Sequence, residues 1–155
     1  MIRILLVDDH TLVREALRLV LEQDCGMQVV AEAGDGETAL RMAEEFAPDV
    51  VVMDVALPGQ SGIETTRRLL AGHPGIKVLA LSTYLDRSIV RQMLEAGANG
   101  YITKSAAGVE LIQGILSLIA GHSYLSREVA ALVTNKLRGR PAASAATGNT
   151  VAKIR

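Results

Sequence analysis

The chain carries a set of polar groups that together could perform phosphoryl chemistry. Each follows an apolar run, and they comprise three carboxylates, a hydroxyl and an ammonium group: Asp8, Asp9, Asp54, Ser82 and Lys104. Carboxylate oxygens are the ligands that Mg²⁺ prefers, while lysine and hydroxyl groups bind phosphoryl oxygens. A carboxylate can also act as the nucleophile toward phosphorus. The residue types therefore predict a magnesium-dependent phosphoryl site.

The apolar runs predict buried strands, and segments with helical periodicity separate them. Five strand–helix units in strict alternation predict an α/β fold, a doubly wound, five-stranded parallel sheet with helices on both faces. We expect the flavodoxin-like strand order 2-1-3-4-5. Because the strands are parallel, their carboxyl ends lie at one edge of the sheet, where ligands bind. The expected strands span residues 2–7, 28–32, 50–53, 77–81 and 100–103, and the expected helices 11–24, 37–46, 63–70, 87–96 and 108–120.

Composition excludes several classes of protein. The 155 residues are 49% hydrophobic but only 3% aromatic, which predicts an aliphatic core. The net charge of −1 gives no overall attraction to nucleic acid or acidic lipid. The single cysteine, Cys25, excludes a disulfide within the chain. The first residues do not resemble a signal peptide, and no apolar run approaches the roughly 18 residues of a membrane span. We therefore expect a cytoplasmic protein with no membrane partner.

The polar residues lie within four motifs that resemble one known family. The motifs are LVDDH at residues 6–10, VMDVALPGQSG at 52–62, LST at 81–83 and GANGYITK at 97–104. In this order and spacing, residues 1–121 resemble the receiver domain of two-component response regulators. The segment Asp9–Leu17, and Ser105 in place of the proline common after the lysine, resemble the LuxR-type (NarL/FixJ) subfamily.

The resemblance implies a phosphoacceptor and a metal site. Asp54 would accept a phosphoryl group from a phosphohistidine on a sensor histidine kinase. Asp9, Asp54 and the backbone carbonyl of Ala56 would bind Mg²⁺ directly, and Asp8 would bind it through water. The domain would be regulatory rather than an enzyme, although it would support its own phosphotransfer and autodephosphorylation.

The same resemblance assigns roles in switching and timing. Lys104 would pair with the phosphoryl group, Ser82 would move to hydrogen-bond it, and Tyr101 would turn inward. Ala56 and Tyr84 would flank the path of the attacking water. Because alanine cannot orient water and tyrosine can shield the phosphoryl group, we expect slow self-dephosphorylation.

The segment after the receiver has a different character. Within the segment 122–138, residues 126–137 predict a short C-terminal or linker helix with Ser126 as its N-cap, and residues 139–155 are typical of a flexible linker. We expect the linker to lead to a DNA-binding domain that these residues do not include. Phosphorylation would then promote a homodimer that binds promoter DNA through that domain and regulates transcription.

Other functions remain open at this stage. One alternative is a stand-alone receiver that acts through protein–protein interaction. A phosphohydrolase with an aspartate nucleophile usually has a second acid two residues later, where this chain has Ala56. A flavodoxin-like nucleotide binder would need glycines and backbone amides where the chain has Asp8 and Asp9. His10 follows these acids and is expected to be an exposed loop residue rather than a ligand.

Overall fold

Strands and helices alternate along the chain, as the sequence predicts. The computed structural model describes residues 1–83 and 85–138, so Tyr84 and the predicted linker at 139–155 lie outside the described residues. The strands are β1 (Ile2–Val7), β2 (Met27–Ala33), β3 (Val50–Asp54), β4 (Lys77–Ser82), β5 (Gly100–Thr103) and β6 (Tyr124–Leu125). The helices are α1 (Thr11–Leu21), α2 (Gly36–Phe46), α3 (Gly62–Gly72), α4 (Arg87–Glu95), α5 (Ala107–Ile119) and α6 (Arg127–Arg138), and a short 3-10 helix (Lys104–Ala106) joins β5 to α5.

The sheet is parallel and has the predicted order with one addition. The order is β2-β1-β3-β4-β5-β6, which confirms the doubly wound α/β prediction and the order 2-1-3-4-5. The sixth strand was not predicted. It pairs Tyr124 with Gly100 and Leu125 with Tyr101, and two residues are too few to show a periodic pattern.

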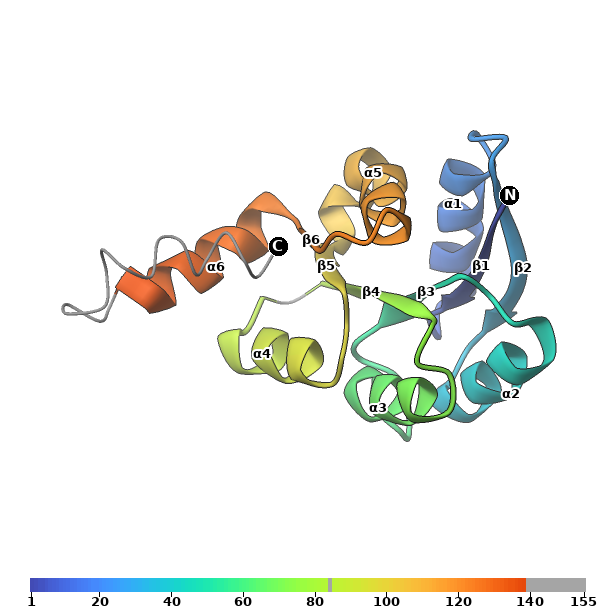
Figure 1. Ribbon diagram of the computed structural model, residues 1–155, viewed down its shortest axis with the longest axis horizontal. Helices are drawn as coiled ribbons and strands as arrows, with labels where there is room; N and C mark the ends of the chain where they lie inside the picture. Colours follow the sequence, from blue (N-terminus) through green and yellow to red (C-terminus); the bar gives the residue numbers. More distant parts are fainter. Residues whose placement is uncertain (84, 139–155) are drawn as a thin grey trace.

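Helices cover both faces of the sheet (Figure 1). Helices α1 and α5 lie on one face, and α2, α3 and α4 lie on the other. Successive strand residues point to opposite faces, so Leu5 and Met53 pack toward α2–α4, while Leu6 and Val52 pack toward α1 and α5. Both clusters are mainly aliphatic, as the composition predicts.

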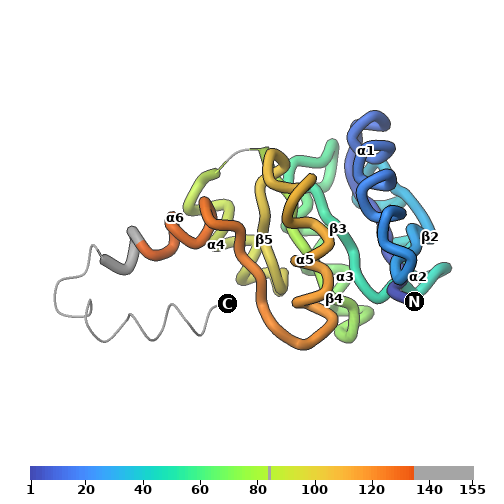
Figure 2. Tube along the Cα trace, turned by 90° about the horizontal axis from the view of Figure 1, so that it is seen from above, coloured from blue at the N-terminus to red at the C-terminus, as the bar shows by residue number. Residues whose placement is uncertain are grey.

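Helix α6 packs on the receiver beside α4 and β5 (Figure 2). Val129 on α6 is fully buried in the same apolar cluster as Tyr101 on β5. The Ser126 N–H donates to the Tyr101 carbonyl at 3.0 Å, which continues the main-chain pairing of β6 with β5. Ser126 directly precedes the helix as predicted, but its buried hydroxyl makes no capping hydrogen bond to a described residue. Among the described residues, no helix combines the length and apolar character needed to cross a membrane.

Glycines permit two features of the chain that position the site. Gly97 follows α4 with φ of 116°, the left-handed geometry that ends a helix, as predicted. Gly62 begins α3 directly beside the end of β3. A Cβ atom at Gly62 would lie 2.2 Å from the Asp54 carbonyl oxygen and 2.8 Å from the Val55 Cα. Glycine at this position therefore allows α3 to approach the end of β3 closely.

Candidate functional site

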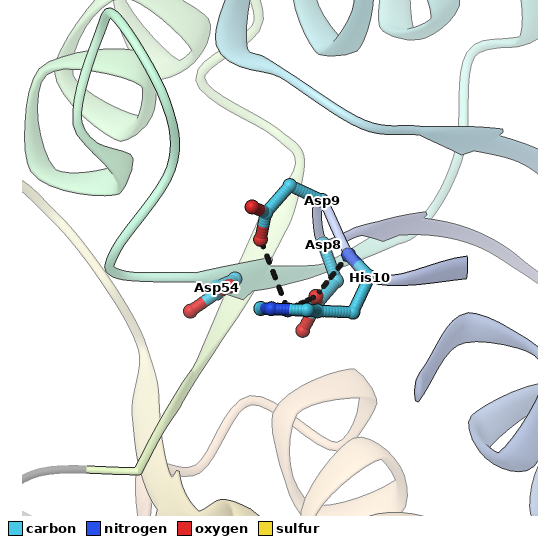
Figure 3. A group of neighbouring side chains, drawn as sticks. All are labelled: Asp8, Asp9, His10 and Asp54. Atoms are coloured by element: carbon cyan, nitrogen blue, oxygen red, sulfur yellow. Dashed lines mark hydrogen bonds and ion pairs between the residues drawn. The ribbon is translucent and has the colours of Figure 1, made fainter. Parts of the chain in front are cut away.

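Acidic side chains from two strand ends meet at one edge of the sheet (Figure 3). Asp8 and Asp9 follow β1, and Asp54 ends β3, which pairs directly with β1. One ligand atom from each of these acids and from His10 lies within 4.8 Å of the others. Lys104, directly after β5, places its Nζ 2.8 Å from Asp8 Oδ2 and 3.3 Å from Asp54 Oδ2. We call Asp8, Asp9, Asp54 and Lys104 the acidic pocket.

The pKa values of the two buried acids of the pocket shift in opposite directions. The Asp8 side chain is 1% exposed and the Asp54 side chain 4% exposed. Burial acts to raise the pKa of Asp8, but hydrogen bonds from Lys104 and His10 outweigh it and hold that pKa below its ordinary value. Burial and the nearby charge of Asp8 raise the pKa of Asp54, and Lys104 offsets this only in part. Asp54 is therefore the carboxylate whose charge is less well compensated.

Lys104 stays charged in this pocket. Burial acts to lower its pKa, but the hydrogen bond to Asp8 and the charges of Asp54 and Asp8 raise the pKa overall. The pocket holds three carboxylates and one ammonium group, which leaves two negative charges uncompensated. A divalent cation would neutralise that excess, and Mg²⁺ binds oxygen ligands of this kind. The donor set of the pocket therefore fits the predicted Mg²⁺.

The loop after β3 orients the Asp54 carboxylate. The Ala56 N–H donates to Asp54 Oδ1 at 3.1 Å, while the other oxygen, Oδ2, faces Lys104. The Ala56 side chain is exposed. Ser61 accepts a hydrogen bond from the Glu64 N–H at 3.2 Å and so caps α3 at the end of this loop.

His10 lies closer to the acids than the sequence predicts. Its side chain is exposed, but Nδ1 lies 3.0 Å from Asp8 Oδ1 and 3.1 Å from Asp9 Oδ1. Its backbone N–H also donates to Asp8 Oδ1 at 2.8 Å. The residue therefore orients the two acids, in addition to being an exposed loop residue.

Ser82 and Tyr101 lie together on neighbouring strands. Ser82 ends β4, is buried, and pairs in register with Thr103 of β5. Tyr101 is fully buried. Burial raises the pKa of its hydroxyl, and the Ser82 side chain partly offsets this, so the two hydroxyls are neighbours. The Tyr101 ring is already buried in this structure. The inward turn of this ring on phosphorylation stays a prediction.

Comparison with known proteins identifies the family. The model of the response regulator receiver domain matches residues 4–116. The chain belongs to the response regulator receiver family. It is 46% identical over 130 residues to the response regulator GacA of Pseudomonas viridiflava and 38% identical over 130 residues to the response regulator UvrY of Escherichia coli. These alignments cover 84% of this chain but only 61% and 60% of the relatives, so the chain spans about three fifths of their length.

Solved structures support the same family. A two-component response regulator of the LuxR family from Aurantimonas superposes with a TM-score of 0.84 at 40% identity, covering 86% of this chain and 96% of that one. The isolated receiver domain of RcsB from Salmonella enterica, determined with the phosphomimetic BeF₃⁻, gives a TM-score of 0.79 at 22% identity and supports the fold alone. These comparisons confirm the predicted resemblance to response regulator receivers of the LuxR-type (NarL/FixJ) subfamily.

Two contacts at the pocket were not predicted from the sequence. Arg14 and Glu32 form an ion pair at 2.9 Å next to the end of β1, and Arg14 also donates to the Asp8 backbone carbonyl. The residues are far apart in sequence, and charged side chains on a helix and an outer strand ordinarily face solvent. The available signal was that Arg14 lies in the segment resembling the LuxR-type subfamily.

Proposed function

We propose that Asp54 accepts a phosphoryl group from a phosphohistidine of a sensor histidine kinase. The observation that carries this proposal is the buried Asp54 carboxylate, whose Oδ2 lies 3.3 Å from Lys104 Nζ and which lies in one cluster with the carboxylates of Asp8 and Asp9. In the transfer, Asp54 Oδ2 would attack phosphorus, the P–N bond to histidine would break, and its electron pair would return to the imidazole. A second candidate, an aspartate-nucleophile hydrolase, is disfavoured because Ala56 cannot serve as acid or base.

The residues of the acidic pocket would share the work of this step. Asp9, Asp54 and the Ala56 carbonyl would hold Mg²⁺, with Asp8 bound through water. The cation would neutralise charge on the phosphoryl oxygens during transfer. Lys104, released in part from Asp54, would pair with the transferred group.

Strand β5 would transmit the conformational change from the acidic pocket to α6. Lys104 follows β5 directly, and Ser82 lies beside Tyr101 within the sheet. A phosphoryl group on Asp54 would draw Lys104 and the Ser82 hydroxyl toward it. Because Tyr101 and Val129 share one apolar cluster, movement of β5 would reach α6, which lies within the segment 122–138 that we expect to contain the linker helix.

Dimerisation is proposed as a consequence of phosphorylation. Large apolar side chains are exposed on the neighbouring helices α1 and α5. Monomeric soluble proteins rarely expose a large group of such side chains together. These are Leu12, Leu19, Val109, Leu116 and Ile119. We propose that a second copy covers this surface, and size-exclusion elution with and without beryllofluoride would test it. An unchanged elution volume would contradict the dimer proposal but would leave the phosphoacceptor proposal unaffected.

The proposed output is transcription in the cytoplasm. One matching structure is of a LuxR-family response regulator, and another concerns the interaction of the Salmonella typhimurium response regulator RcsB with DNA. We propose that this receiver, residues 1–121, controls promoter binding by a DNA-binding domain joined through residues 139–155. The stand-alone receiver is the alternative.

We also propose a slow loss of the phosphoryl group. Ala56 is exposed two residues after Asp54 and has no polar atom in its side chain to orient an attacking water. Tyr84, two residues after Ser82, would shield the group. A half-life of minutes or longer is expected for the purified phosphoprotein, and loss within seconds would contradict this proposal.

Ligand-dependent stability tests the phosphoacceptor proposal. Beryllofluoride with Mg²⁺ should raise the unfolding free energy of the wild type by about 2.7 kcal/mol at about 100 times the dissociation constant. Asp54→Ala should show no increase. Asp49→Asn, an exposed acid at the opposite end of β3, should respond like the wild type. An equal response in Asp54→Ala, or none in the wild type, would overturn the proposal.

A further inference from the structure

Arg14 connects three parts of the chain beside the acidic pocket. It lies on α1, and its side chain is only 17% exposed. Its Nε donates to Glu32 Oε1 on β2 at 2.9 Å, and its Nη1 donates to the backbone carbonyl of Asp8. A weaker contact joins Nη2 to Thr11 Oγ1 at 3.5 Å. Arg14 therefore ties the first helix to the end of β1 and to the outer strand.

These contacts fix the backbone at the point where the acids leave the sheet. The Asp8 N–H donates to the Ala33 carbonyl of β2 at 3.0 Å, and the Asp8 carbonyl accepts from Arg14. Both main-chain groups of Asp8 are thus held. Because Asp9 follows directly, the direction of its carboxylate depends on the peptide plane whose carbonyl Arg14 binds.

We propose that Arg14 is a positioning residue for the metal, holding the Asp8–Asp9 peptide so that both carboxylates face Asp54. This inference rests on the proposed function of a metal-dependent phosphoacceptor. An arginine is needed because its planar guanidinium donates in several fixed directions at once. A lysine would keep the charge, but its single ammonium group lacks the Nε and Nη1 geometry that joins Glu32 to the carbonyl.

Glu32 holds Arg14 in this orientation. Burial acts to raise the pKa of Glu32, but hydrogen bonds from Arg18 and Arg14 outweigh it and keep the pKa below its ordinary value. Glu32 therefore remains a charged acceptor. Arg18 binds the same carboxylate through Oε2 at 2.6 Å and also pairs with Glu22 at 3.0 Å. Arg18 lies one helical turn further from the loop, which makes it a matched control for Arg14.

Magnesium titration of the full chain tests this role. Dissociation constants for Mg²⁺ would be measured by calorimetry on the wild type, Arg14→Lys, Arg14→Ala and Arg18→Ala, with melting temperatures recorded in metal-free buffer. Partners that orient metal ligands typically contribute about 10-fold or more to affinity. We expect both Arg14 variants to bind Mg²⁺ about 10-fold more weakly and Arg18→Ala to bind like the wild type. Arg14→Ala and Arg18→Ala should lower the melting temperature to a similar extent.

The outcomes separate the two proposals. If the wild type binds Mg²⁺ and Arg14→Lys matches it, charge alone suffices and the positioning role is wrong. Equal weakening by Arg14→Ala and Arg18→Ala would assign the effect to general stability and would also overturn it. If the wild type itself binds no Mg²⁺, the proposed function fails together with this inference. Backbone amide signals of Asp9 and His10 in metal-free protein should shift in Arg14→Lys but not in Arg18→Ala.

Discussion

The acidic pocket and the edge of the sheet formed by β5, β6 and α6 are held together by different forces. In the pocket, buried charges face one another, and the pKa values of Asp8 and Asp54 shift in opposite directions. At the edge, which we call the α6 edge, main-chain pairing and apolar burial of Val129 and Tyr101 predominate. The pocket is electrostatically incomplete without a cation, whereas the α6 edge is already packed.

Strand β5 belongs to both regions. Tyr101 lies within the α6 edge, Thr103 Oγ1 donates to Glu128 Oε1 of α6 at 3.4 Å, and the next residue, Lys104, reaches into the pocket. A change of charge at Asp54 therefore acts on a strand that is attached to α6. The difference between the regions indicates where ligand binding should act and where substitutions should only destabilise.

The largest expected effect concerns the close approach beneath the pocket. Gly62→Ala would place a Cβ atom 2.2 Å from the Asp54 carbonyl oxygen. Overpacking against backbone should destabilise the protein by about 3 kcal/mol. Urea unfolding followed by circular dichroism measures this, and Gly72→Ala, at the other end of α3 with no atom within 4 Å, is the control. Equal stability of the two variants would show that α3 can move away from β3.

The α6 edge should respond to loss of apolar volume. Val129→Ala removes two methyl groups from a fully buried position and should cost about 2 kcal/mol. Val109→Ala makes the same change at a position that is 87% exposed and should be nearly neutral. The same urea unfolding experiment compares them. If Val129→Ala is also neutral, α6 does not pack on the receiver in solution.

Smaller effects of opposite sign are expected from the two buried acids without Mg²⁺. Because the pKa of Asp54 is raised, its ionisation disfavours the fold as pH rises through that pKa, so Asp54→Asn should raise the melting temperature at pH 7. Asp8 has a lowered pKa and contributes stability above the ordinary carboxyl range, so Asp8→Asn should lower the melting temperature.

The pH dependence checks the sign of each effect. The gain from Asp54→Asn should disappear as pH falls below the ordinary carboxyl pKa. The loss from Asp8→Asn should shrink as pH falls toward the lowered pKa of Asp8. Thermal unfolding from about pH 2 to about pH 8 measures both changes, because they fall at or below the ordinary carboxyl pKa. A loss of stability in both variants at pH 7 would contradict the difference between these acids.

Topology made much of the fold and pocket predictable. Five alternating units imply that strand carboxyl ends meet, and the structure brings Asp8, Asp9, Asp54 and Lys104 together. The order and spacing of the four motifs then indicated the family. These predictions depend on periodicity and chain order, which a single sequence contains.

Contacts between distant surface residues were not predictable in the same way. The Arg14–Glu32 pair joins residues on different elements, and charged side chains show no periodicity that selects partners. Tyr101 is fully buried because α6 packs over β5, a tertiary contact that the pattern of residues 126–137 leaves open. His10 likewise contacts the acids through the local course of the loop.

Locating a phosphoryl group on the chain tests the central claim most directly. The protein would be incubated with acetyl phosphate in Mg²⁺ or in a chelator, digested, and the peptides analysed by mass spectrometry. The account predicts one phosphoryl group on Asp54 in Mg²⁺ and none when Mg²⁺ is chelated. A phosphoryl group on a different residue, modification that does not require the metal, or an unmodified chain would contradict it.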